Sequence, residues 1–188
     1  MDAQDVDVST DLGWRAVLAF WDGAGPGKWF AKDAAFDAAF HARFIATHEA
    51  SARGEVNEWA HAPSSCLALL LLLDQFPRNA FRGTPRMYAT DAAAIEVARH
   101  AVAAGFDRRV EGLLRLFFYL PFAHSERLED QEVSVALNRR LGQPWLSHAE
   151  DHRNIVKRFG RFPHRNPILG RPSTPEEIAF LAAGGFSG

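Results

Sequence analysis

The sequence has few thiols and few long apolar stretches, and both absences narrow the class of protein. Cys66 is the single cysteine, so the chain cannot form an internal disulfide or a zinc site built on several cysteines. The apolar run around Cys66 favours a small buried hydrophobic residue over a reactive thiol. That run, from Cys66 to Leu73, is the longest in the chain at eight residues, whereas a membrane span needs about 20.

The chain also lacks a strong charge of either sign. Its 21 basic and 23 acidic side chains leave a net charge of −2, so no overall field recruits nucleic acid or an anionic membrane. The N-terminus has four aspartates and no cation before Arg15, the reverse of a signal peptide. We therefore expect a cytoplasmic protein with no nucleic-acid partner and no membrane partner. Only three of the basic residues are lysine. The excess of arginine reflects either genome composition or a need for guanidinium groups in fixed directions.

Strand-forming patterns are missing as well, because no stretch alternates four or more β-branched or aromatic residues. Apolar residues instead recur at three- and four-residue spacing, as Phe36, Phe40 and Phe44 do in a helix predicted at about 33–53. The sequence predicts a frayed acidic segment at 1–9, followed by a single compact all-α domain at 10–188. Short connections favour seven to eight helices packed as antiparallel pairs.

Capping residues and helix breakers indicate where these helices begin and end. A helix from Pro63, apolar on every side at its centre, is predicted to end at residues 74–77. A further helix is predicted at 107–119. The predicted N-caps are Thr10 or Asp11, Thr90, Ser125 and Thr174, the last with a capping-box spacing to Glu177.

Three segments carry most of the unusual polar residues, each at a helix end or in a loop: residues 74–83, 121–126 and 158–171. Rigid helices fix such residues while leaving them accessible to a ligand. Residues 151–171 hold six cations against Asp151 alone, a local charge of +5. Arginine forks suit carboxylate and phosphate groups, although an internal ion-pair network is the alternative. Counted together, the segments keep surplus positive charge, which must face water or an anion because burying an unpaired arginine is costly.

The leading hypothesis is a polar pocket, formed by all three segments, that binds a small anionic molecule, with catalytic turnover as a further step. Simpler roles remain open: Ser125 and Glu126 suit a helix start, and His124 suits an oriented loop histidine. No cofactor is expected. The predicted anion clamp is Arg78, Arg82, Arg161 and Arg165; the proton-transfer candidates are His124 and His164, oriented by Asp74 and Glu126; Gln75, Asn79 and Asn166 complete the ligand-binding set.

A metal site is the weaker interpretation. His148 and His152 have the i, i+4 spacing of two zinc ligands on a helix. However, glutamate does not directly follow the first histidine, as a zinc-peptidase helix requires, and the neighbouring positive charge disfavours a divalent cation. We therefore expect no metal. Residues 23–27, GAGPG, lack the preceding strand and the Lys-Ser/Thr of a phosphate-binding loop.

The order of these motifs over residues 12–186 resembles the bacterial domain-of-unknown-function 924 family. The resemblance implies an all-α domain similar to a tetratricopeptide-like superhelical array, and it implies no established activity. Because no repeat of about 34 residues is readable, a peptide groove is not implied, but a helical protein- or peptide-interaction module, in which the motif residues only tie helices together, is the second hypothesis. The resemblance rests on KWF at 28–30, DQFPRN at 74–79 with RG at 82–83, Asp91, PF at 121–122, HSE at 124–126, Gln131, His152, FGRFPHRN at 159–166, GR at 170–171, Thr174, Glu176 and Glu177.

Overall fold

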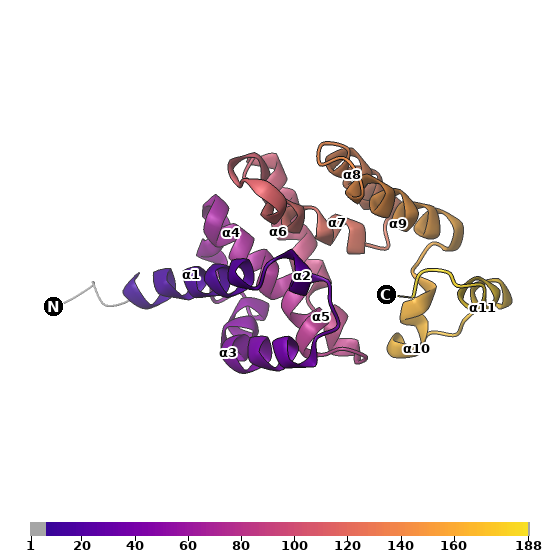
Figure 1. The fold of residues 1–188 in the computed structure, drawn as a ribbon, viewed down its shortest axis with the longest axis horizontal. Coiled ribbons are helices and arrows are strands. Elements are labelled where there is room, and N and C mark those ends of the chain that lie inside the picture. The colour runs from indigo at the N-terminus through magenta and orange to yellow at the C-terminus, as the bar shows by residue number, and fades with distance from the viewer. Residues whose placement is uncertain (1–6, 188) are drawn as a thin grey trace. The chain divides into compact units, whose positions relative to one another are not determined.

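The computed structural model describes residues 7–187, with side chains from residue 13 onward. Over this range the chain forms helices and turns and no strand, which confirms the predicted all-α class. The described residues contain eleven α-helices, labelled α1 to α11 (Figure 1), and six 3₁₀- or π-helical segments, η1 to η6. The predicted seven to eight helices are therefore too few, because short helical segments occupy stretches predicted as loops or as one longer helix.

Contacts between residues divide the chain into two compact units, which are described separately below. Unit 1 comprises Met1–Arg82 and Arg86–Pro121, and unit 2 comprises Gly83–Pro85 and Phe122–Gly188. Unit 1 contains α1 (Asp7–Ala24), α2 (Pro26–Trp29), α3 (Ala34–Ala52), η1 (Asn57–His61), α4 (Pro63–Leu70), η2 (Leu71–Gln75), α5 (Phe76–Ala80), most of η3 (Pro85–Tyr88), α6 (Asp91–Ala103), η4 (Asp107–Arg109) and η5 (Gly112–Phe118). Helix α7 (Leu120–His124) includes Pro121 and Phe122, where the assignment changes, and unit 2 continues with α8 (Leu128–Asn138), α9 (Trp145–Phe159), η6 (Pro163–Arg165), α10 (Asn166–Leu169) and α11 (Pro175–Ala182).

The core of unit 1 is built around α4 and η2. All residues from Cys66 to Leu73 are at most 2% exposed, as expected for a helix that is apolar on every side. Trp21 packs against this core with its ring centroid 5.3 Å from those of Phe40 and Phe117. Aromatic rings at this spacing add to the free energy gained by burial.

The helix predicted to end at residues 74–77 continues to Ala80, because η2 is a π-helical turn that leads directly into α5. In this turn the Phe76 N–H donates to the Leu71 carbonyl. Pro77 has no N–H. It therefore cannot donate to the Leu72 carbonyl, as the π-helical pattern would require, or to the Leu73 carbonyl, as the α-helical pattern would require. A breaker therefore changes the hydrogen bonding here without ending the helix.

Two side chains distant in sequence supply the missing donors. His48 Nδ1 donates to the Leu72 carbonyl at 2.9 Å, and the Thr90 hydroxyl donates to the Leu73 carbonyl. Both side chains are buried, and burial lowers the pKa of His48. Since a buried carbonyl without a donor is costly, the two bonds hold α3 and the start of α6 against the π turn.

The predicted caps differ in outcome. Thr174 accepts a hydrogen bond from the Glu177 N–H in a complete capping box at the start of α11, as predicted. Thr90 lies at the N-cap of α6, but its hydroxyl is used by the Leu73 carbonyl instead. The N-cap of α8 is Arg127 rather than Ser125, whose hydroxyl donates to Asp130 Oδ2 at 2.7 Å. The predicted helix at 107–119 is instead a pair of 3₁₀ segments, η4 and η5.

The start of the chain differs in part from the prediction. Helix α1 begins at Asp7, so Thr10 and Asp11 lie inside the helix and do not cap it. Of the segment predicted to be frayed, residues 7–9 are helical and residues 1–6 lie outside the described residues. Among residues 7–187, no helix combines the length and apolar character that a membrane span requires.

Unit 2 is built on the pair α8 and α9, which lie side by side (Figure 1). Gly160 ends α9 with a left-handed backbone, φ 69°, a conformation that glycine adopts without the steric cost of a Cβ. This turn brings Phe162 back onto Ile155 and Val156 in a small core, against which Phe159 and Phe180 pack. The tetratricopeptide-like array remains a prediction.

Candidate functional site

In unit 1, the polar residues of the first segment form a dense ion-pair network. Arg78 donates to both carboxylate oxygens of Asp91, at 2.8 and 3.0 Å, and lies 3.1 Å from Asp74 Oδ1. Asp74 is 1% exposed and also accepts from Gln75 Nε2 at 2.7 Å. The Arg78 guanidinium is therefore matched by two carboxylates and ties α5 to α6.

The other two predicted residues of this segment bind one carboxylate on α3. Asn79 Nδ2 donates to Asp37 Oδ1 at 2.7 Å, and Arg82 contacts both oxygens of Asp37 through Nε and Nη2. Sequence reasoning did not single out Asp37, which lies more than 40 residues away. These contacts hold α5 and Arg82, the second residue after it, against α3.

In unit 2, the second and third segments meet at Glu126. Arg171 donates to both oxygens of this carboxylate, at 2.7 and 2.9 Å, and the Phe162 N–H donates to Oε1 at 2.8 Å. Burial alone would raise the pKa of Glu126, but the hydrogen bonds from Arg171 and Phe162 and the charge of Arg165 lower it. Two guanidinium groups thus act on one carboxylate.

A second carboxylate, Glu177, holds the other side of this region. Arg161 donates to both of its oxygens, at 2.6 and 2.8 Å, and Asn166 Nδ2 adds a bond of 3.2 Å. The hydrogen bond from Arg161 is the main cause that lowers the pKa of Glu177 to about 2. The positive surplus predicted from sequence stopped at Arg171 and so omitted Glu177 and Glu176, which accepts from Arg158 at 2.9 Å.

Arg165 lies in a different environment from Arg161 and Arg171. It is 7% exposed, its Nη2 donates to the backbone oxygen of His124 at 2.8 Å, and its guanidinium carbon is 4.6 Å from the centre of the Phe162 ring. The 3₁₀ segment η6 fixes its position.

His152 and His164 lie around the same two aromatic rings. Their ring centroids are 5.5 and 5.7 Å from that of Phe162, and 4.6 and 5.1 Å from that of Phe186. Burial, followed by the charge of Arg165, lowers the pKa of His164 to about 4. Burial also lowers the pKa of His152 to about 4, and the charges of His124 and Arg165 act in the same direction. Both imidazoles are therefore neutral at pH 7.

The ring nitrogens of these histidines differ in what they contact. His152 Nδ1 donates to the His148 backbone oxygen at 2.7 Å, so the i, i+4 spacing serves a helix-internal hydrogen bond. His164 Nδ1 is buried and has no hydrogen-bond partner among the described residues. Within residues 7–187 no group of three or more histidine, cysteine, aspartate or glutamate residues is arranged to hold a metal ion.

The structure thus brings together Arg165, Glu126 and the three histidines at positions 124, 152 and 164, all in unit 2. Sequence reasoning proposed His152 only as half of a metal pair. The separation of 12 residues between His152 and His164 in the sequence did not indicate that their side chains lie close together. Phe186, which covers both imidazoles, was not singled out at all.

The all-α fold and the order of these motifs place the chain in a class of bacterial helical proteins. The family described as "Bacterial protein of unknown function (DUF924)" matches residues 17–185, and the chain belongs to this family. A solved structure of a protein of unknown function from Agrobacterium tumefaciens, ATU0120, is similar to it, with 54% sequence identity and a TM-score of 0.91 over 93% of this chain and 99% of that chain. The comparison with curated proteins gave no match.

Proposed function

We propose that unit 2 binds a small anionic molecule beside Arg165, with His124, His152 and His164 as its hydrogen-bonding and acid–base groups. The observation that carries this proposal is the buried Nδ1 of His164, which has no hydrogen-bond partner among the described residues and lies in the same cluster as the Arg165 guanidinium. Arg165 and Arg171 act on the single carboxylate of Glu126, while His152 and His164 are neutral at pH 7 because their pKa values are about 4. Guanidinium groups bind carboxylate and phosphate through charge-assisted hydrogen bonds, so an anion is the class of ligand that suits a cluster containing Arg165.

The chemistry of the imidazoles supports a role beyond binding. A histidine with a pKa near 4 is deprotonated at pH 7, so it can accept a proton from a bound molecule more readily than it can donate one. His164 has an unpartnered buried Nδ1, and His152 has Nδ1 engaged by a carbonyl. In this proposal Arg165 binds the anion, His164 is the base, and Glu126 orients Arg165.

The remaining candidate residues receive a supporting role in this proposal. Arg161 and Asn166 hold Glu177 and so fix the loop that carries His164 and Arg165. In unit 1 the paired residues fix α5 instead: Asp74, Gln75, Arg78, Asn79 and Arg82.

Titration with inorganic phosphate and with acetate, followed by thermal unfolding, tests the proposal. At a concentration of 100 times the dissociation constant, the bound anion should add about 2.7 kcal/mol to the free energy of unfolding. Arg165→Gln should abolish the effect, whereas Arg158→Gln, which removes an exposed arginine of the same unit, should retain it. His164→Asn should weaken it, which keeps the test decisive if Arg165→Gln fails to fold. No stabilisation by either anion, or equal stabilisation of Arg165→Gln, would overturn the proposal.

The second candidate function is a helical protein- or peptide-interaction module. One observation favours it: four of the motif arginines are engaged in two-point contacts with carboxylates and tie helices together. Ile178 on α11 is 58% exposed and is the side chain that a partner would cover first. Co-purification followed by hydrogen exchange would support this candidate if protection falls on α11. Protection confined to residues 158–171 would count against it.

A further inference from the structure

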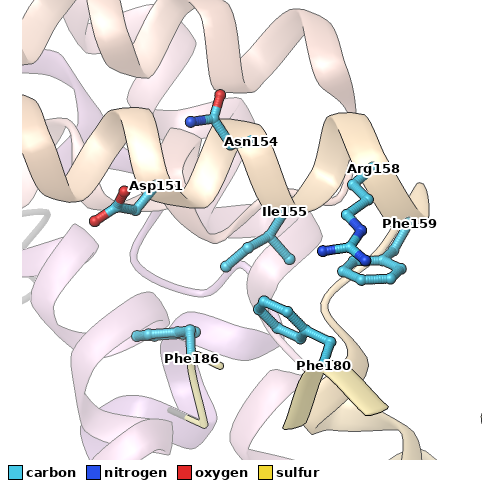
Figure 2. A pocket seen from close by; sticks show the side chains of 7 residues that line it. All are labelled: Asp151, Asn154, Ile155, Arg158, Phe159, Phe180 and Phe186. Carbon is cyan, nitrogen blue, oxygen red and sulfur yellow. The ribbon is translucent and has the colours of Figure 1, made fainter. Parts of the chain in front are cut away.

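Unit 2 contains a pocket that lies along α9 and includes none of the residues of the proposed anion site. It is a pocket of about 330 Å³, lined by five residues of α9 and by two phenylalanines from the C-terminal part of the chain. A volume of this order is sufficient for a small organic molecule. The lining residues are Asp151, Asn154, Ile155, Arg158, Phe159, Phe180 and Phe186 (Figure 2).

The pocket has a polar helix face on one side and aromatic rings on the other. Asp151, Asn154 and Arg158 follow one another along α9 at spacings of three and four residues, which places them on one face. Figure 2 shows Ile155 pointing from α9 towards the rings of Phe180 and Phe186, with Asp151 and Arg158 to either side of it and Asn154 on the side of the helix away from the rings. A ligand here would have its apolar part against the rings and a polar group against α9.

The charges around the pocket select the sign of that polar group. Asp151 is exposed and has no ion-pair or hydrogen-bond partner among the described residues, so its carboxylate is available to a ligand. Arg158 is matched by Glu176 at 2.9 Å. Asp151, Arg158 and Glu176 therefore sum to one negative charge, which attracts a cation and disfavours a carboxylate or phosphate.

The aromatic rings point to the same sign. The Arg158 guanidinium carbon lies 4.7 Å from the centre of the Phe159 ring and 5.8 Å from that of Phe180, so these rings already stabilise a cation in this structure. The face of a phenyl ring attracts organic cations through its quadrupole. One class of ligand suits the carboxylate of Asp151, the aromatic walls and the volume of the pocket together.

We propose that this pocket binds an organic ammonium ion with an apolar or aromatic body. The ammonium group lies against Asp151, and the apolar body lies against Phe180 and Phe186. This site is distinct from the anion site at Arg165, and the two take ligands of opposite charge. Phe186 is near both sites, since it lines this pocket and also contacts His152 and His164.

Three probes of nearly equal size test the proposal: benzylammonium, benzyl alcohol and phenylacetate, each titrated into the intact chain and followed by NMR. Benzylammonium should bind at least about tenfold more tightly than benzyl alcohol, with shifts at residues that line the pocket, and phenylacetate should bind most weakly there. Absence of benzylammonium binding, or equal affinity for the alcohol or the phenylacetate, would overturn it.

Variants separate the carboxylate from the rings. Asp151→Asn should remove the preference for benzylammonium over benzyl alcohol. Glu150→Gln, which makes the same charge change on the preceding residue of α9 outside the lining, should preserve it. Phe180→Leu keeps an apolar wall without the ring, so it should weaken benzylammonium and benzyl alcohol alike and leave the preference between them. Equal preference in Asp151→Asn and in the unmodified chain would contradict the site.

Discussion

At the scale of single residues, the arginines differ in what their guanidinium groups contact. Those at positions 78, 82, 161 and 171 each meet both oxygens of a carboxylate from another segment. Arg165 instead donates to a backbone oxygen and lies over a ring, beside two neutral imidazoles. The first group therefore serves stability, and Arg165 is the arginine to which we assign anion binding.

The pairing of Arg161 predicts a large loss of stability on its removal. Glu177 is 2% exposed, so Arg161→Gln leaves this carboxylate without its strongest partner and should lower the free energy of unfolding clearly. Arg158→Gln is the matched control, since it breaks a pair whose side chains are both more than half exposed, and it should cost less than about 1 kcal/mol. Urea unfolding measures both, and similar losses in the two variants would contradict the assigned roles.

The lowered histidine pKa values predict a specific loss of stability in acid. In the unfolded chain a histidine has a pKa near 6.5, whereas His152 and His164 have values of about 4 in the fold. The unfolded state therefore binds more protons between these values, so stability is fully present above pH 6.5 and is lost as the pH falls towards 4. His164→Asn should flatten part of this decline in denaturant unfolding from pH 7 to pH 4, whereas His61→Asn, at an exposed position, should leave it unchanged. An unaltered decline in His164→Asn would show that its pKa is not lowered.

At the scale of elements, local rules succeed where a helix end is satisfied by its own residues. Thr174 and Glu177 satisfy each other across one turn, so the capping box was predictable from four positions. The continuation of α4 through η2 into α5 was not, because it depends on His48 and Thr90, which lie 24 and 17 residues away. Proline predicts a helix end only when the carbonyls it leaves behind have no other donor.

The π turn predicts a coupling between Thr90 and Pro77. Thr90→Val removes the donor to the buried Leu73 carbonyl and should cost about 1–2 kcal/mol. Pro77→Ala restores a backbone N–H within reach of Leu72 and Leu73, so the Thr90 substitution should cost less in that background. A double-mutant cycle in urea measures the difference, with Thr47→Val on α3 as a control for the side-chain change. Equal costs in both backgrounds would show that the two residues do not serve the same carbonyls.

The candidate site was predictable in part for the same reason. Residue types and helix-end positions identified Arg165, His164, His124 and Glu126 from sequence, and all four lie in unit 2. The carboxylate partners of the other arginines were not predictable from local charge, because Asp37, Asp91 and Glu177 reach them only through the fold. Counting charge within a segment overstated the surplus for this reason.

At the scale of the whole molecule, the net charge of −2 is nearly neutral. The two sites that we propose in unit 2, at Arg165 and at Asp151, would nevertheless take ligands of opposite charge. Both depend on the turn after α9 and on the segment that ends with Phe186. The chain shares its fold with a family member of 54% identity over nearly its full length, so that protein offers a second sequence in which both sites can be tested.

The most direct test of the anion site is an NMR titration of the His164 imidazole with and without inorganic phosphate. In the free chain the resonance should titrate with a midpoint near pH 4, because burial and Arg165 disfavour the imidazolium. Bound phosphate brings negative charge beside the ring and should raise that midpoint, and Arg165→Gln should abolish the rise. A midpoint that is the same with and without phosphate would contradict the proposed anion site.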